Sequence, residues 1–176
     1  MKTQAKQLHV FKSTQRGASL LESIAFLGVA AIVILGAVAL LLNSFGSANT
    51  NRAQQEVTSI RTGVKKLYMG QSASYGSGSL TSTLVHAKVF PTTLAVVASG
   101  NVMNAWNGTV DVVGATSSFA ITYANVPRDV CMNLASANGD WLGVNVNGSD
   151  LSLPVTPTAA EGACADGGNT MTWTAG

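Results

Sequence analysis

Residues 17–42 read GASLLESIAFLGVAAIVILGAVALLL, and this stretch decides the architecture of the chain. Residues 24–42 are 19 consecutive positions without a charged or strongly polar side chain. At a rise of about 1.5 Å per residue, a helix over this run matches the thickness of a bilayer core. The run therefore predicts a helix that lies in a membrane or in another apolar environment.

Residues 1–17 are polar and basic, and they hold four of the ten Lys and Arg residues but no acid. Residues 18–176 therefore carry six basic and eight acidic side chains, a formal −2 against +2 for the whole chain. A positive flank stays cytoplasmic, so the part after the apolar run is expected in the periplasm. The basic balance belongs to the leader, and it does not indicate nucleic-acid binding by the folded part.

Three interpretations of the apolar run compete. A secretory signal peptide has a shorter apolar stretch with a small-residue cleavage site after it. A plain membrane anchor fits the length but leaves Glu22 unexplained, because a carboxylate inside an apolar helix is costly and is by default a functional residue. The third interpretation is a processed subunit that uses this carboxylate in assembly.

The third interpretation rests on a resemblance. Arg16-Gly17 followed by Ala18-Ser19-Leu20-Leu21-Glu22 and an apolar run resembles the processing site of type IV prepilins. The resemblance implies that prepilin peptidase cuts between Gly17 and Ala18 and methylates the new amine of Ala18, where the family most often has Phe, Met or Leu. It also implies that Glu22 pairs with the N-terminal ammonium of a neighbouring subunit during assembly.

The resemblance implies a division into a removed leader (1–17), a membrane and filament-core helix half (18–45) and a periplasmic or surface globular domain (46–176). The expected partners are other copies of the chain, prepilin peptidase, the inner-membrane assembly machinery and, before assembly, the inner membrane itself. The product is an extracellular pilus for adhesion, aggregation or conjugative contact. The alternatives are a minor pilin or type II secretion pseudopilin in the same fold, or a single-span membrane-anchored binding protein or enzyme.

The apolar helix is expected to continue to about residue 69. The apolar residues Phe45, Ala53, Val57, Ile60, Val64 and Leu67 recur mainly at intervals of three and four residues, which predicts one apolar face. Gly28, Gly36 and Gly46 interrupt the helix. They either permit close packing in a membrane or, most readily near Gly46, allow local melting in the filament.

The rest of the chain predicts an α+β domain with an antiparallel sheet. Turn signals occur at residues 107–108, 138–139 and 147–148, where Asn precedes Gly. The expected elements are short helices at 80–88 and 126–134, a short apolar piece at 94–97, and strands at 109–113, 119–124, 141–146, 151–155 and 170–174.

This order of elements resembles the type IV pilin fold, and the long leader resembles its type IVb class. Residues 104–108, NAWNG, resemble an N-x-W-G-G segment that opens the sheet in that class. Residues 126–134 resemble the helix with the first cysteine of its C-terminal disulfide region. In an oxidising compartment Cys131 and Cys164 are expected to form a disulfide; in a cytosolic domain they would be two free thiols.

The sequence predicts neither an enzyme nor a metal or cofactor site. His9 lies in the leader and His86 on a predicted short helix, so the mature chain has one histidine. The acids lack the spacing of a metal-binding loop. Trp106, Trp141 and Trp173 are expected in the core or in subunit contacts rather than in a ligand cage.

Overall fold

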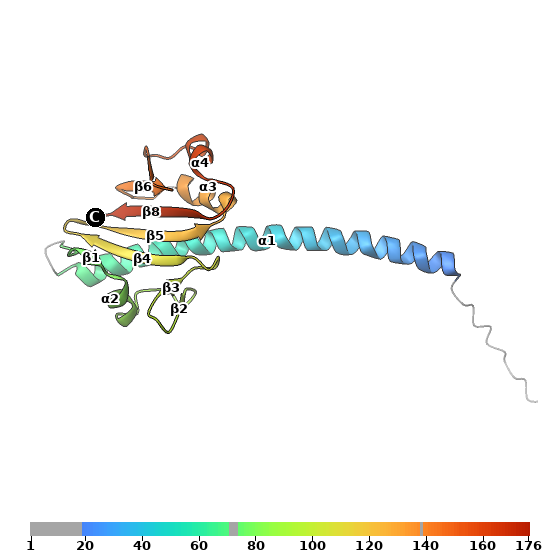
Figure 1. Cartoon of the computed structure of the whole chain (residues 1–176), viewed down its shortest axis with the longest axis horizontal. Coiled ribbons are helices and arrows are strands. Elements are labelled where there is room, and N and C mark those ends of the chain that lie inside the picture. Colours follow the sequence, from blue (N-terminus) through green and yellow to red (C-terminus); the bar gives the residue numbers. More distant parts are fainter. Residues whose placement is uncertain (1–18, 71–73, 138) are drawn as a thin grey trace, which may run out of the picture. The chain divides into compact units, whose positions relative to one another are not determined.

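The computed structural model describes residues 19–70, 74–137 and 139–176 (Figure 1). The chain divides into two compact units, Met1–Leu42 and Asn43–Gly176. Helix α1, Leu20–Tyr68, begins in the first unit and ends in the second. The single long helix expected over residues 19–69 is therefore confirmed to within one residue at each end.

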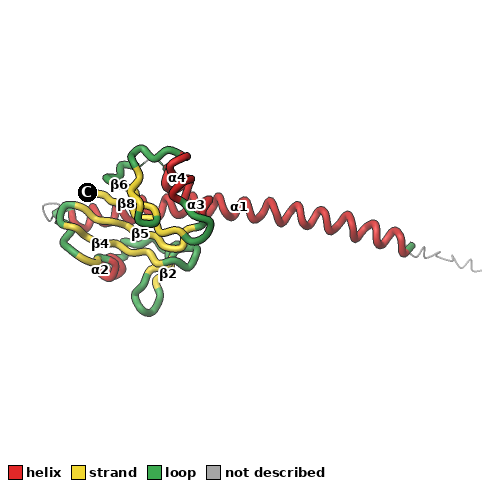
Figure 2. Tube along the Cα trace, turned by 45° about the horizontal axis from the view of Figure 1, so that its top comes forward, coloured by secondary structure: helices red, strands yellow, loops and turns green. Residues whose placement is uncertain are grey.

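The second unit is built on an antiparallel sheet of eight strands in the order β2-β3-β4-β5-β8-β6-β7, with β1 paired to β4. The strands are β1 (Gly78–Ser79), β2 (Ala95–Val96), β3 (Val102–Met103), β4 (Thr109–Ala115), β5 (Ser118–Val126), β6 (Gly143–Val146), β7 (Ser149–Leu151) and β8 (Asn169–Ala175). The short helices are α2 (Thr81–His86), α3 (Arg128–Ser136) and α4 (Pro157–Ala163). Figure 2 shows α2 and α4 on opposite sides of the strands.

The core forms between one face of the sheet and the C-terminal part of α1. Ala53, Val57, Ile60 and Val64 are each at most 3% exposed. They meet alternate residues of the central strands, all fully or almost fully buried: Val110, Val112, Phe119, Ile121, Tyr123, Met171 and Trp173. The spacing of three and four residues gives α1 one apolar face, and the two-residue period gives the sheet another. The two faces bury each other, which explains why these segments pack together.

The observed elements confirm most of the predicted ones, and they correct some. The predicted strands at 109–113, 119–124 and 170–174 are the cores of β4, β5 and β8, and the predicted helices at 80–88 and 126–134 correspond to α2 and α3. The piece at 94–97 is β2, and β6 begins two residues later than predicted.

The predicted strand at 151–155 is wrong. Pairing with β6 ends at Leu151, and Pro154 lies within the predicted range. Proline has no N–H to donate, so this segment cannot extend a strand ladder. A helix, α4, follows instead, with the Thr156 hydroxyl accepting a hydrogen bond from the Ala159 N–H at 3.3 Å.

The Asn104 side chain stabilises the turn that precedes β4. Its Oδ1 accepts hydrogen bonds from the N–H groups of Trp106 and Gly108 at 2.9 Å, and its Nδ2 donates to the Ala124 carbonyl at 2.7 Å. Asn107 adopts a left-handed φ of 57°. The turn predicted at 107–108 is confirmed, as is the one at 147–148, where both residues have positive φ. The signal at 138–139 falls partly outside the described residues.

We expect Gly108→Ala to destabilise the domain by about 3 kcal/mol, at the upper end for overpacking in a packed interior. A Cβ at this position would lie 1.8 Å from the Ala124 carbonyl oxygen, so β4 and β5 would have to separate. Gly162→Ala is the matched control, because a Cβ there meets no atom within 4 Å and α4 favours alanine. Urea unfolding followed by tryptophan fluorescence measures both; equal midpoints would contradict the expectation.

Candidate assembly site

The first half of α1 exposes an apolar surface along its whole length. Within the described residues of the first unit, large side chains such as Leu20, Phe26, Ile32 and Leu35 are 69–81% exposed. An 18-residue window of α1 has a mean hydropathy of 2.9, and none of it is buried within the protein. By length and composition α1 can cross a membrane. So large an exposed apolar surface requires cover from lipid or from other protein.

Glu22 lies in the first turn of α1 and is exposed. The backbone N–H of Glu22 donates to the Ser19 hydroxyl at 3.2 Å, so Ser19 caps the helix with Glu22 three residues later. A carboxylate here is favourable because the N-terminal end of a helix carries partial positive charge. Gly17 and Ala18, the predicted processing site, lie outside the described residues.

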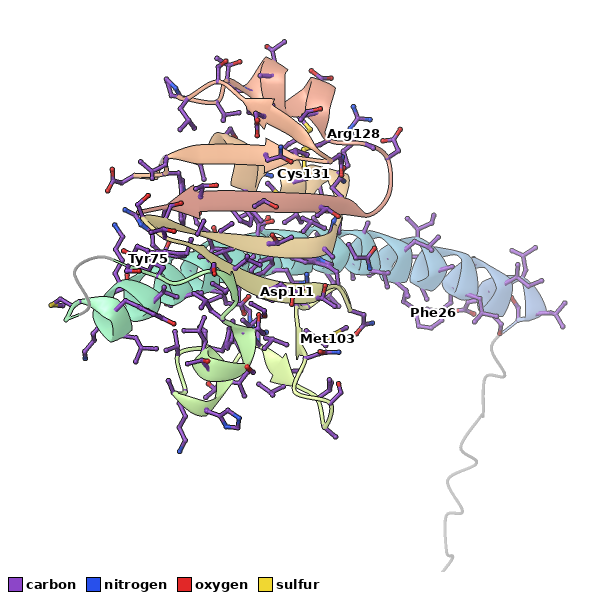
Figure 3. The ribbon with its side chains drawn as sticks, turned by 60° about the vertical axis from the view of Figure 1, so that its left-hand side comes forward. Phe26, Tyr75, Met103, Asp111, Arg128 and Cys131 are labelled. Atoms are coloured by element: carbon purple, nitrogen blue, oxygen red, sulfur yellow. A yellow bond between two sulfur atoms is a disulfide. The ribbon has the colours of Figure 1, made fainter. Side chains whose placement is uncertain are left out.

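The predicted disulfide between Cys131 and Cys164 is present. The two Cα atoms are 6.0 Å apart, and both residues are at most 3% exposed. Cys131 belongs to α3, and Cys164 caps the C-terminus of α4. Figure 3 shows the sulfur atoms beside Cys131, between the two helices. The bridge closes a segment of 33 residues that contains β6, β7 and α4.

Asn169 stabilises the same C-terminal region through hydrogen bonds. The sequence analysis did not identify this residue. It is fully buried, and its Nδ2 donates to the carbonyls of Val126 and Ala165 at 3.0 Å. Its Oδ1 accepts from the Ala165 N–H and the Asn147 amide, each at 2.8 Å. A buried amide with its partners satisfied specifies one arrangement of the segments around it.

A buried acid joins α1 to the sheet. Glu56 is 5% exposed and pairs with Arg52 at 3.2 Å, while Arg52 also donates to the Thr93 carbonyl at 2.8 Å. The Tyr123 hydroxyl donates to the second Glu56 oxygen at 3.5 Å. Burial, and next the Glu56 charge, raise the pKa of Tyr123, which therefore stays a neutral hydrogen-bond donor. The network connects α1, β5 and the loop before β2.

The three tryptophans occupy different positions. Trp173 is 2% exposed and belongs to the core, while Trp106 and Trp141 are partly buried against it. The Arg61 guanidinium lies 4.8 Å from the Trp141 ring centre and 2.7 Å from an Asp140 oxygen. The interpretation of the tryptophans as core residues is thus confirmed for Trp173. His86, the last residue of α2, is exposed.

Known proteins share this architecture. The crystal structure of TcpA, a type IV pilin from Vibrio cholerae, aligns with a TM-score of 0.54 at 16% identity, covering 73% of this chain and 99% of that one. The long helix with an apolar first half, the antiparallel sheet and the disulfide-bounded C-terminal region therefore define a type IV pilin fold.

Sequence relatives narrow the assignment. The major structural subunit of bundle-forming pilus from Escherichia coli O127:H6 is 26% identical over 185 residues, covering 92% of this chain and 95% of that protein. Toxin coregulated pilin of Vibrio cholerae serotype O1 is 26% identical over 144 residues, covering 77% and 63% respectively. The family model described as PilS N terminal matches residues 47–176, well over half of the sequence. The chain belongs to that family.

Proposed function

We propose that this chain is a structural subunit of a type IVb pilus. The observation that carries the proposal is an apolar helix half, uncovered within the chain, that continues into a compact pilin-fold domain. Such a helix has two suitable environments, a bilayer before assembly and the packed helices of neighbouring copies afterwards. Relatives that match most of the chain are named as pilus subunits, which supports the same role.

The division of the chain follows from this role. Residues 1–17 are a leader, residues 18–45 form the membrane and filament-core segment, and residues 46–176 form the surface domain. Prepilin peptidase cuts the Gly17–Ala18 bond and methylates Ala18, and the assembly machinery then moves the subunit from the inner membrane into an extracellular filament. Glu22 pairs with the Ala18 ammonium of a neighbouring subunit, since each charge is costly in an apolar core unless it is paired.

The proposed role is structural rather than catalytic, as the names of the relatives that match most of the chain suggest. Among the described residues, no group of three or more His, Cys, Asp or Glu side chains is placed to hold a metal ion. The buried polar groups of the second unit serve packing: Asn104 and Asn169 bind backbone groups, and Glu56 bridges helix and sheet. The filament acts through its surface, in adhesion, aggregation or contact between mating cells.

Mass spectrometry of the mature chain tests the processing step. We expect the chain recovered from surface filaments to begin at Ala18 with one added methyl group, and to be the dominant mass in those filaments. A mature chain that retains Met1, or that is cut after residue 42, would contradict the pilin assignment and favour a membrane-anchored or secreted protein. A correctly processed chain that is only a trace component would instead identify a minor pilin.

A further inference from the structure

A shallow groove lies at one end of the sheet in the second unit. Its lining includes Trp106, Asn125, Pro127, Arg128, Gly167 and Gly168. These residues come from the turn before β4, the end of β5, the start of α3 and the loop before β8. We call it the entry groove, because it lies at the end of the second unit where the chain enters from the apolar run.

Contacts of α1 identify this end. The second unit begins at Asn43, directly after the apolar run. A Cβ built on Gly46 would lie 3.8 Å from a carboxylate oxygen of Asp129, the residue that follows Arg128 of the groove. Figure 3 shows Arg128 and Tyr75 at opposite ends of the sheet, and the Tyr75 ring lies 5.6 Å from that of Tyr68, where α1 ends.

The length of the chain keeps the entry groove near lipid headgroups in a membrane-inserted precursor. Only four residues separate Gly46 from Leu42, the last residue of the apolar run. Even fully extended, four residues cover about 14 Å. The headgroup layer on each side of the bilayer core is about 5–7 Å thick. When residues 24–42 span the bilayer, the Gly46 end of the second unit therefore lies at the membrane surface.

Trp106 gives the groove an aromatic ring with a polar edge. The side chain is partly buried, and the Trp106 carbonyl accepts a hydrogen bond from the Asn125 amide at 2.5 Å, which holds the turn beside the end of β5. Tryptophan is enriched where membranes meet water, because its ring is apolar and its N–H donates hydrogen bonds. In the described part of the chain, the indole N–H of Trp106 donates to no protein group. This N–H can therefore serve a ligand.

Arg128 gives the groove a cation with unused donors. Its side chain is 40% exposed, and one guanidinium nitrogen lies 2.6 Å from an Asp166 oxygen. A guanidinium has five N–H donors in a fixed planar arrangement, which suits the oxygens of a phosphate. The contact with Asp166 occupies one edge of the group, and the remaining donors can bind a phosphate without breaking that pair.

The charges around the groove favour a headgroup that carries both signs. The pKa of Arg128 is raised by its hydrogen bond to Asp166, by the Asp166 charge and, less strongly, by the Glu161 charge. With Asp129, three carboxylates surround one guanidinium, so a purely anionic ligand would be repelled. A phosphate followed by an ammonium group matches this arrangement, because Asp166 is 86% exposed and can accept from the ammonium.

We propose that the entry groove binds the headgroup of a phospholipid that carries a phosphate and a primary ammonium. Arg128 and the Trp106 indole N–H bind the phosphate oxygens, and Asp166 pairs with the ammonium. The inference rests on the proposed function, because the membrane-inserted precursor is the form that brings the groove to a bilayer. The site holds the surface domain against the inner membrane before the subunit enters the filament.

Fluorine NMR of the full-length chain in nanodiscs tests this site. The chain labelled with 5-fluorotryptophan gives one signal each from Trp106, Trp141 and Trp173, assigned by replacing each tryptophan with phenylalanine. We expect the Trp106 signal to shift when phosphatidylethanolamine is added to phosphatidylcholine discs, because the choline ammonium has no N–H for Asp166. Phosphatidylglycerol, which has no ammonium, should give about a third of that shift or less. The other two signals should stay in place.

Substitutions at Arg128 and at a distant cation complete the test. Arg128→Gln should reduce the Trp106 shift at least about threefold, because an amide lacks the charge that attracts the phosphate. Lys66→Gln is the matched control. Lys66 is an exposed cation on α1, 20 residues after Gly46 and hence about 30 Å along the helix, so its loss should leave the shift unchanged.

Two outcomes separate this site from the function on which it rests. Equal Trp106 shifts with phosphatidylethanolamine and phosphatidylglycerol, or an unchanged shift in Arg128→Gln, would overturn the headgroup site alone. Failure of the unmodified chain to float with lipid vesicles would instead contradict the membrane-inserted precursor, on which both the proposed function and this site depend.

Discussion

Removing the disulfide by Cys131→Ala/Cys164→Ala is expected to destabilise the second unit by about 3–4 kcal/mol, from the loop-closure entropy of a 33-residue segment. The effect is large because the free energy of unfolding of a native domain is only about 5–15 kcal/mol. The closed segment holds β6, β7 and α4, and β6 joins this segment to the sheet by pairing with β8. We expect surface filaments to disappear while the membrane-inserted precursor persists.

Two further measurements distinguish the contribution of the covalent bond from that of the packing around it. Cys131→Ser/Cys164→Ser adds two hydroxyls to a site that is at most 3% exposed, so a loss beyond that of the alanine pair measures the cost of burying them. Reduction of the unmodified protein with dithiothreitol should lower its urea midpoint as far as the alanine pair does. Equal filament mass with both cysteines replaced would show that the polar network of Asn169 suffices to hold this region.

Elements that are defined by patterns among neighbouring residues can be predicted from the sequence. The apolar run and the Ser19 cap define where α1 begins, and the spacing of Val57, Ile60 and Val64 identifies the face that packs on the sheet. Strands β4, β5 and β8 carry a larger apolar residue at every second position, such as Val110 and Val112, Phe119 and Ile121, or Met171 and Trp173, so they too can be predicted from the sequence. The Thr156-Pro157 pair marks the start of α4 and was available as a signal.

Other features depend on partners far away in sequence. β1, β2 and β3 have two residues each, too few for any periodicity, and they exist because β4 or β3 lies beside them. In the sequence, Asn169 cannot be distinguished from other polar residues near turns. Its role depends on hydrogen bonds with Val126 and Asn147, which are distant in sequence.

Replacing Glu22 is expected to have the largest effect on assembly. In the proposed filament core, Glu22→Ala leaves the Ala18 ammonium of a neighbour unpaired in an apolar environment. Breaking a buried ion pair in this way costs about 3–5 kcal/mol, or about 10²- to 10⁴-fold in assembly affinity per subunit. We expect filaments to be lost while mass spectrometry still finds the chain cut after Gly17. Gly17→Glu should act earlier and leave the precursor uncut.

Glu22→Gln distinguishes ion pairing from a merely structural role. Glu22 is also the third residue after the Ser19 cap, and glutamine serves that position in a capping box. If Glu22 only started the helix, the glutamine variant would assemble normally; if it pairs with an ammonium, glutamine should fail as alanine does. Ser23→Ala is the matched control, because Ser23 is an exposed neighbour whose hydroxyl donates to the Ser19 carbonyl at 3.4 Å. Full filament mass from Glu22→Gln would therefore refute the pairing.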